Sequence, residues 1–441
     1  MWKELAWATV LLALPSIAAP QQPPLVPPVA PTAAVLPPPS QAPAPSARIT
    51  IEEAISLAIQ HNHALQAART TILQNQALET TANLRPNPTL TWDAQFLPIF
   101  QPSKFNSDYI DNQAQFDLGI GYLFERGKKR QHRLQAAKDQ TTVIRSQVAD
   151  NERTLVANVS QQFVAVLLAE SSLDFAQQDL DSFGKTVDIS QTRYKAGAMS
   201  EGDFLKIKLQ LLQFQTDVST AKLAKVQALA ALRQFLGFES VPDFYDVDGQ
   251  LDYQAVKAGP DDLKALALRS RPDLAAAQQS VTAARSQELL ARANGKRDLG
   301  VSFNYSHVAD TNTGAFFFNI QLPIFDRNQG EIARTGFVIN QAEQLASETS
   351  QQVVTDVVDA YEALRASEQI VQLYRSGYVD AAKESRDISE YAFKHGAASL
   401  LDYLDAERTY RANQLAYRQA LATYMTALEQ TRQAVGTRNL P

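Results

Sequence analysis

Four short segments of the chain alternate apolar and polar residues with a period of two, at about residues 89–97, 114–124, 299–307 and 315–325. In the first of them, apolar and polar positions interleave as Leu90, Trp92, Ala94, Phe96 and Thr91, Asp93, Gln95. Each segment is therefore predicted to be a strand with an apolar, aromatic face and a mostly polar face. Two structures fit this pattern. One is an antiparallel sheet covering a protein core, and the other is a membrane β-barrel with its apolar face toward lipid.

Long stretches between these segments have the pattern of coiled-coil helices. Residues 128–196 contain no proline and a single glycine, Gly184, so a continuous or gently interrupted helix could extend roughly 100 Å at about 1.5 Å per residue. Apolar or aromatic residues recur every seven positions in three series: Val159, Val166, Leu173, Leu180, Val187; Val357, Leu364, Val371, Tyr378; and Tyr403, Tyr410, Tyr417, Tyr424. Such heptads predict helix-packing seams. The tyrosine series is interpreted as a seam with its hydroxyls at the wet edge; a ligand-binding surface is the alternative.

Shorter helices precede the strands in each half of the chain. Thr50 and Glu53 form a capping-box pattern that opens a helix to about Leu84, and Arg85-Pro86 ends it. In the second half, a helix is predicted from near Pro260 to near Asn294.

The two halves repeat one another. Residues 194–205 match residues 393–404 at a constant separation of 199 positions, and both halves run in the order helix, two strands, very long helix, turn, long helix. The predicted division is a first repeat at 48–240, an inter-repeat or equatorial segment at 241–259, a second repeat at 260–436 and a tail at 437–441.

The best-matched part of the repeat is a helical turn. Gly197 and Gly396 suit the left-handed position just past a helix end. Ser200 and Ser399 suit N-caps, with Asp203 and Asp402 three residues further on. Each motif predicts an αα-hairpin, placed at the end of its repeat farthest from the strands.

The N-terminal region differs in composition from the rest of the chain. Residues 1–18 combine an early Lys3, a short apolar core and Ser16-Ile17-Ala18, which predicts a secretory signal peptide; an uncleaved anchor is the alternative. Eleven of the 21 prolines lie within residues 20–45, so residues 19–47 are predicted to be a Pro-rich disordered arm. No later segment has about 18 consecutive apolar residues, so no transmembrane helix is expected after the leader.

Composition removes several classes of function. The chain has 441 residues, no cysteine, 41 basic and 47 acidic side chains, a net charge of −6 and a mean hydropathy of −0.24. Disulfides and thiolate sites are thus absent, and nucleic acid is not an expected partner. No phosphate loop, nucleophile elbow or zinc-ligand spacing is present, and the His61-Asn62-His63 triplet does not place both rings on one helix face. We therefore expect no enzymatic activity, no cofactor and no metal site.

Four strands cannot close a membrane barrel, because closed barrels begin at about eight strands and open edges in lipid leave backbone groups unpaired. Three chains would supply twelve strands. The predicted fold is mainly α with a membrane β part: a trimeric, 12-stranded membrane β-barrel, four strands per chain, continuous with a long α-helical coiled-coil barrel. The resemblance described next implies that the β-barrel lies in the outer membrane and the helical barrel in the periplasm.

Several motifs together resemble the TolC-like outer membrane factor family of Gram-negative efflux and secretion systems. They are the duplicated order of elements, the paired Gly-x-x-Ser-x-x-Asp turns and Arg271-Pro272-Asp273-Leu274 at the start of the second half. The resemblance implies a trimeric, passive conduit from the periplasm to the exterior, which docks on a periplasmic adaptor protein and an inner-membrane pump of the resistance-nodulation-division type. Residues 322–331 and 124–130 look closest to the heavy-metal-cation branch, the cobalt–zinc–cadmium type.

The resemblance also implies a gate at the periplasmic tip. Asp402 and Asp405 match family positions that form a carboxylate constriction, and Asp203 matches an acceptor that helps latch the closed state. The chain departs from the family at the latch tyrosine and arginine positions, which hold Phe393 and Ala398. Helix capping alone is the alternative role for Asp203 and Asp402, whereas capping does not explain Asp405.

Other functions share parts of this pattern. Drug efflux and type I protein secretion use the same architecture as metal efflux. A soluble periplasmic coiled-coil structural protein would explain the heptads, but not four lipid-type strands placed symmetrically in the two repeats.

Overall fold

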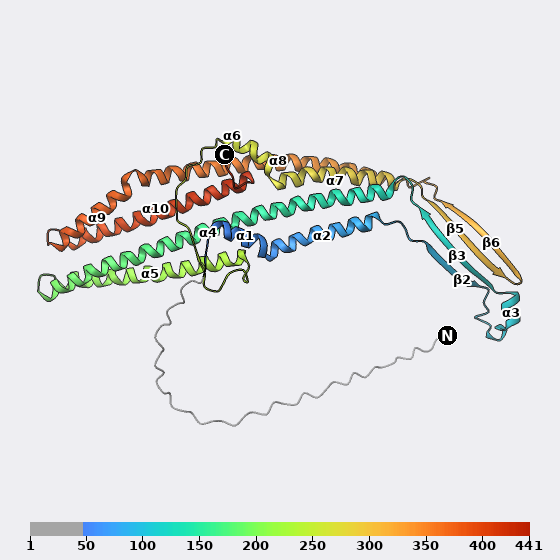
Figure 1. The fold of residues 1–441 in the computed structure, drawn as a ribbon, viewed down its shortest axis with the longest axis horizontal. Helices are drawn as coiled ribbons and strands as arrows, with labels where there is room; N and C mark the ends of the chain where they lie inside the picture. Colours follow the sequence, from blue (N-terminus) through green and yellow to red (C-terminus); the bar gives the residue numbers. More distant parts are fainter. Residues whose placement is uncertain (1–46) are drawn as a thin grey trace, which may run out of the picture. The chain divides into compact units, whose positions relative to one another are not determined.

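The structure is a computed structural model and describes residues 47–441. The predicted signal peptide and the Pro-rich arm up to residue 46 lie outside these residues. Within the described part, the two repeats follow one another along the chain and contribute helices and strands to common layers (Figure 1).

The first repeat contains a short strand, two helices, two strands with two short helical segments between them, and two long helices. Its elements are β1 (Arg48–Ile49), α1 (Ile51–His61), α2 (His63–Asn83), β2 (Thr89–Gln95), η1 (Pro102–Lys104), α3 (Ser107–Asn112), β3 (Gln115–Phe124), α4 (Lys129–Lys195) and α5 (Glu201–Leu236). The short strand β4 (Asp246–Val247) lies in the segment that joins the repeats.

The second repeat has the same order of main elements. They are α6 (Pro260–Ser270), α7 (Pro272–Asn294), β5 (Leu299–Val308), β6 (Thr311–Ile320), α8 (Gln329–Leu373), the π-helical turn η2 (Tyr374–Tyr378), α9 (Val379–Lys394) and α10 (Leu400–Val435). The mainly helical fold with an internal duplication is thus confirmed.

The four long strands form one antiparallel sheet in the order β2-β3-β5-β6. Its apolar face is uncovered by the rest of the described chain, because Leu90, Trp92, Phe316 and Phe318 are 68–74% exposed. The sheet therefore does not cover a core within this chain, which removes the first of the two interpretations of the alternating pattern. Strands β2 and β6 are the two edges, and each pairs on one side only.

The fourth strand lies earlier in the sequence than the alternating pattern predicts. The pattern places it at about 315–325, whereas β6 spans Thr311–Ile320. It pairs in register with β5, from Val308 opposite Thr311 to Leu299 opposite Ile320. The alternation of apolar residues continues through Leu322 and Ile324, but β5 offers no partner beyond Leu299 and Pro323 has no N–H to donate.

The helices before the strands are each interrupted once, which the sequence reading did not anticipate. Thr50 and Glu53 form the predicted capping box, but the helix breaks at Asn62, whose ψ of 114° is extended. The Asn62 side chain caps α2 by accepting from the Leu65 N–H at 3.0 Å and also donates to the Phe235 carbonyl at 3.0 Å. The second hydrogen bond attaches the break between α1 and α2 to α5.

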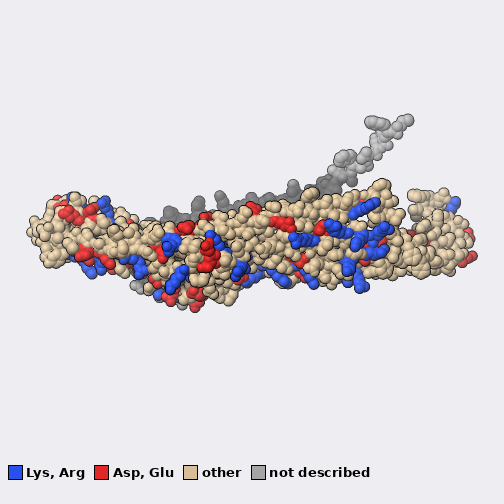
Figure 2. Space-filling model, turned by 90° about the horizontal axis from the view of Figure 1, so that it is seen from above, with Lys and Arg blue, Asp and Glu red and all other residues tan. Residues whose placement is uncertain are grey.

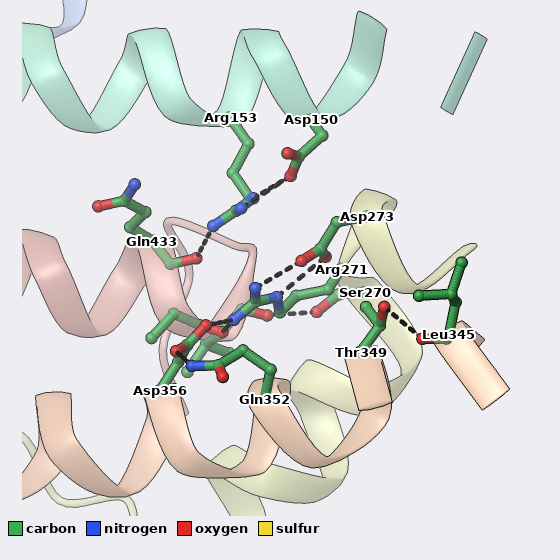
Figure 3. Close-up of polar contacts among 12 residues, drawn as sticks. Asp150, Arg153, Ser270, Arg271, Asp273, Leu345, Thr349, Gln352, Asp356 and Gln433 are labelled. Carbon is green, nitrogen blue, oxygen red and sulfur yellow. Dashed lines mark hydrogen bonds and ion pairs between the residues drawn. The ribbon is translucent and has the colours of Figure 1, made fainter. Parts of the chain in front are cut away.

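Arg271 makes the corresponding break between α6 and α7 and connects three parts of the second repeat (Figure 3). Its guanidinium is buried and binds Asp273 at 2.5 Å, Asp356 of α8 at 2.7 Å and the Ala434 carbonyl at the end of α10 at 3.3 Å. Arg153 of α4 adds a bond of 2.6 Å to the Gln433 carbonyl. The Arg271-Pro272-Asp273 motif thus ties the second repeat to the end of the chain.

The long helices differ between the repeats. Helix α4 is continuous over 67 residues, but its counterpart is divided into α8 and α9 at Gly377, which has φ of +116° inside a π-helical turn. The seam residues Val159, Val166 and Val357 are fully buried, whereas Tyr378, which ends the second heptad series at this break, is 60% exposed.

The segment that joins the repeats packs across the middle of the helices. Strand β4 pairs in parallel with β1, a pairing that the sequence reading missed. The Tyr245 hydroxyl donates to the Leu229 carbonyl of α5 at 2.6 Å, and the Tyr253 hydroxyl donates to Glu368 of α8 at 2.5 Å. The segment is therefore anchored to helices of both repeats.

No helix within residues 47–441 has an apolar stretch long enough to cross a bilayer.

Candidate gate at the helical hairpin turns

The predicted turns join α4 to α5 and α9 to α10, at the opposite ends of these helices from the sheet (Figure 1). Both turns use glycine in the left-handed region, with φ of +75° at Gly197 and +76° at Gly396. Backbone bonds close each helix end: the Ala198 N–H donates to the Arg193 carbonyl, and the Ala397 N–H donates to the Ala392 carbonyl, both at 2.8 Å. The two turns are therefore the same structure built twice.

The predicted caps are present in both hairpins. Ser200 accepts from the Asp203 N–H at 3.1 Å, and Ser399 accepts from the Asp402 N–H at 3.2 Å. The second hairpin forms a full capping box, in which Asp402 also accepts from the Ser399 N–H at 3.3 Å. Capping thus accounts for part of the role of both aspartates. The Ser200 hydroxyl and Lys206 hold the pKa of the Asp203 carboxyl below its ordinary value.

Asp405 lies outside the cap, one turn further along α10. Its carboxylate is exposed and is 2.7 Å from Arg408, which is also exposed. An ion pair between two exposed side chains holds its geometry weakly, so the Asp405 carboxylate remains available to solvent and to other charges.

Phe393 packs inside an aromatic stack that crosses both hairpins. Its ring stacks on Tyr403 at 5.3 Å, Tyr403 stacks on Phe183 at 6.4 Å, and Phe183 stacks on Phe214 at 4.4 Å. The four rings come from α9, α10, α4 and α5. The tyrosine series is therefore a packing seam, as predicted, although Tyr403 is fully buried and not at a wet edge.

Arg193 provides a direct polar bond between the two turns. Its guanidinium donates to the Phe393 carbonyl at 2.8 Å and lies 5.4 Å from the centre of the Phe393 ring. The latch positions Phe393 and Ala398 do not point to this contact. A basic residue in the last turn of a helix is common, so Arg193 carries no separate signal in the sequence.

A buried group of charges lies further from the turns, between α4, α5, α9 and α10. Arg411 of α10 pairs with Asp179 of α4 at 2.6 Å and also binds Asp217 of α5. Asp179 and Glu407 are each only 4% exposed. The Arg386 guanidinium lies 4.5 Å from the centre of the Tyr410 ring, on the same side of α10.

The buried carboxyls hold protons more tightly than exposed ones. Burial raises the pKa of Glu407 to about 8, and the nearby Asp179 carboxylate adds to this rise, while Arg386 and Arg411 oppose it. Burial likewise raises the pKa of Asp179, against the lowering effect of Arg411. At neutral pH the two carboxyls therefore keep at least one proton between them.

A signal for this group existed in the sequence. Asp179 stands four residues from both Phe175 and Phe183, and Glu407 stands four residues after Tyr403, so both acids fall on apolar stripes of their helices. In the part of the chain that the structure describes, no group of three or more His, Asp or Glu side chains is arranged to hold a metal ion.

The fold and the tip define a class of protein: a mainly helical channel subunit with a lipid-type sheet at one end of its helices and two capped hairpins at the other. The chain belongs to the outer membrane efflux protein family, whose pattern matches residues 54–238 and 263–437. It is therefore an outer-membrane channel of an efflux system, with its helical part in the periplasm. The matched relatives are channel and efflux proteins and not enzymes.

Two relatives are similar in sequence, and one solved structure is similar in fold. The cobalt-zinc-cadmium resistance protein CzcC of Cupriavidus metallidurans is 26% identical over 393 residues, which cover 88% of each chain. The cation efflux system protein CusC of Escherichia coli K12 is 27% identical over 278 residues, which cover 58% of each chain. The crystal structure of the Campylobacter jejuni CmeC outer membrane channel superimposes with a TM-score of 0.73 at 15% identity, covering 88% of this chain and 86% of that one.

Proposed function

We propose that three copies of this chain close into a 12-stranded barrel that continues into a periplasmic helical barrel. The observation that carries this proposal is the four-stranded sheet with an exposed apolar face and two unpaired edges, β2 and β6. In lipid such edges are too costly to leave open, and a threefold arrangement pairs β6 of each copy with β2 of the next. Homologous channels of the family also act as trimers.

The conduit is passive and works with two further proteins. A periplasmic adaptor and an inner-membrane pump, of the resistance-nodulation-division type, would deliver cargo to the hairpin tip. Support comes from the family membership and from the two hairpins that end at the tip far from the sheet.

Asp402 and Asp405, with Asp203 as a latch residue, would form the gate at the tip. The exposure of Asp402 and Asp405, and the position of Asp405 outside the helix cap, support this role. In a trimer the two aspartates of α10 supply six carboxylates around one axis. Such a ring attracts cations and repels anions.

Heavy-metal cations are the proposed cargo. The alignment with a cobalt-zinc-cadmium resistance protein over 88% of both chains supports this cargo, as does the similarity to a cation efflux protein. Drug efflux and protein secretion conduits share the fold and are the alternatives.

The gate is tested by ion selectivity and conductance of the detergent-purified protein in planar bilayers. We expect Asp405→Asn to reduce cation preference and block by divalent cations. Arg408→Gln, which frees the Asp405 carboxylate, should increase both. Asp261→Asn, at an exposed acid on α6, is the matched control and should change neither.

The outcomes separate the parts of the proposal. If Asp405→Asn and Arg408→Gln change neither ion selectivity nor conductance, these residues form only a surface ion pair. The proposed conduit would not be affected by that result. A folded protein that forms neither a trimer nor a pore would overturn the conduit itself.

The cargo is tested in cells. A strain that lacks this gene should become sensitive to cobalt, zinc or cadmium and should recover with the wild-type gene. Sensitivity only to dyes and detergents, or loss of a secreted protein, would instead favour one of the alternatives.

A further inference from the structure

The segments that connect the sheet to the helices are rich in basic residues. Strands β2 and β5 begin, and strands β3 and β6 end, at the end of the sheet nearest the helices, since Phe124 pairs with Leu299 and Leu299 pairs with Ile320. The connecting residues at this end of the sheet are 85–88, 124–133, 292–298 and 321–330, with ten Lys and Arg against three Asp and Glu. The whole chain has the opposite balance, with a net charge of −6.

Most of the basic side chains here lack an acidic partner. Two of the three acids are already occupied: Glu125 binds Arg133 at 2.8 Å, and Asp298 binds Lys129 at 2.7 Å. Seven basic residues form no ion pair within residues 47–441, and one of them, Arg327, donates to the Pro323 carbonyl at 3.1 Å. We call the other six the junction collar: Arg85, Arg126, Lys128, Arg130, Lys296 and Arg297. Figure 2 shows Lys and Arg gathered where the helices approach the strands, next to a strand region with few charges.

Exposed apolar side chains lie directly beside the collar. Phe325 is 90% exposed, Ile324 is 63% exposed and Phe124 is 49% exposed. All three follow or end a strand whose apolar face is uncovered. An apolar face bordered by aromatic and then cationic side chains has the order of a membrane interface: acyl chains, boundary, headgroups.

The proposed trimer brings like charges together at this level. In a threefold arrangement the same end of the next copy's sheet carries the same excess of basic residues. Anionic groups outside the protein can supply the compensating charge. The helices lie in the periplasm, so the end of the sheet that leads into them lies at the periplasmic leaflet.

We propose that the junction collar binds the headgroups of anionic phospholipids in the periplasmic leaflet of the outer membrane and so fixes the depth of the channel in the bilayer. The inference rests on the proposed trimeric barrel. Arg126, Arg130 and Arg297 offer planar guanidinium groups that donate two parallel hydrogen bonds to a phosphate, while Lys128 and Lys296 add point charges. Arg126 and Lys296 lie close to each other's chain segments, because the Arg126 N–H donates to Asp298 at 2.9 Å and Lys296 packs against Gly127. One headgroup can therefore contact both segments.

The test measures lipid retained by the purified trimer. Protein in detergent is incubated with phosphatidylglycerol or with phosphatidylcholine of the same acyl chains, and native mass spectrometry counts the lipids bound per trimer. We expect wild type to retain phosphatidylglycerol in preference to phosphatidylcholine, with a preference that decreases as salt increases. The variant Arg126→Gln/Arg130→Gln/Lys296→Gln/Arg297→Gln should lose about tenfold or more of this preference.

Two control variants separate charge from shape and from net charge. Arg126→Lys/Arg130→Lys/Arg297→Lys keeps the charge and should keep most of the preference. Lys185→Gln/Lys222→Gln/Lys257→Gln/Lys383→Gln removes four exposed charges that lie outside the junction collar, and it should leave the preference unchanged. The pair variant Lys296→Gln/Arg297→Gln, which changes only the segment before β5, should give an intermediate loss if the full variant does not assemble.

Each outcome bears on the proposal. An unchanged phosphatidylglycerol preference in Arg126→Gln/Arg130→Gln/Lys296→Gln/Arg297→Gln overturns it, because the lipid is then held elsewhere. An equal loss in the Lys185/Lys222/Lys257/Lys383 variant also overturns it, because the lipid then responds to general charge. A collar variant that loses the lipid preference but still assembles and conducts supports it. If wild type forms no trimer, the proposed conduit is contradicted before lipid binding is considered. The mass of the assembly, which the same spectra give, distinguishes this result from a loss of lipid binding.

Discussion

Arg411 in α10 and Asp179 in α4 form a 2.6 Å ion pair between the two hairpins, although the residues belong to different repeats. Arg411 also lies 4.1 Å from the centre of the Phe214 ring of α5, and Asp179 shares its buried surroundings with Glu407. The two hairpins are thus joined by charges in their interior as well as by the aromatic stack nearer the turns. Any movement that separates the hairpins must separate these charges.

Stability should depend on pH through Glu407. The pKa of this carboxyl is about 8 in the folded protein and 4.5 ordinarily, so the folded protein keeps a proton that the unfolded chain releases between these values. Stability from this group is therefore complete below about pH 4.5 and decreases as pH rises toward 8, by at most about 1.4 kcal/mol per pH unit. Glu407→Gln should remove this decrease, whereas Glu384→Gln, at an exposed acid of α9, should not.

Chemical unfolding of the detergent-purified protein at pH 5 to 9 measures this effect. If the free energies of unfolding of wild type and Glu407→Gln differ by the same amount at every pH, the folded protein does not keep a proton on Glu407 that the unfolded chain releases.

The bond from Arg193 to the Phe393 carbonyl should restrain the tip. Arg193→Ala removes a charged donor from a half-buried carbonyl, a loss of about 1–2 kcal/mol. We expect amide hydrogens of residues 391–398 to exchange about fivefold or more faster, as measured by hydrogen exchange with mass spectrometry. Lys195→Ala, at an exposed residue two positions away, should leave the exchange as it is; equal effects of both variants would contradict a specific bond.

Arg271 should contribute strongly to the stability of the second repeat. Arg271→Met leaves Asp273 and Asp356 without their buried partner and should lower the free energy of unfolding by about 3 kcal/mol. Arg269→Met, on the exposed side of α6, should change it by less than about 0.5 kcal/mol. Urea unfolding followed by circular dichroism compares the two, and similar midpoints would show that the network contributes little.

Alanine substitutions at two glycines should change the stability of the protein in opposite directions. Gly197 has φ of +75°, so Gly197→Ala places a side chain in the left-handed region and should destabilise the hairpin by about 1 kcal/mol. Gly184 lies inside α4 with open space where a Cβ would be added, so Gly184→Ala should stabilise the helix by up to about 1 kcal/mol. Thermal unfolding of both variants is the measurement, and a shift of the same sign in both would refute the argument.

Features that depend on local pattern can be read from the amino-acid sequence. The period of two at Leu90–Phe96 gave a strand, the heptads through Val159 and Val166 gave a helix seam, and the Ser399–Asp402 spacing gave a cap. The duplication followed from the constant offset between the turns. Each of these depends on residues within a few positions of one another, whose geometry is set by the helix or strand itself.

Which distant residues meet depends on the packing of the whole chain. Asn62 breaks its helix with a bond to Phe235, Arg271 joins Asp356 and the end of α10, and Arg411 finds Asp179 across two hairpins. A polar residue on an apolar stripe can be seen in the sequence, but its partner depends on which helices face each other and in what register. That arrangement results from the packing of all the helices together, and no short segment of the chain contains it.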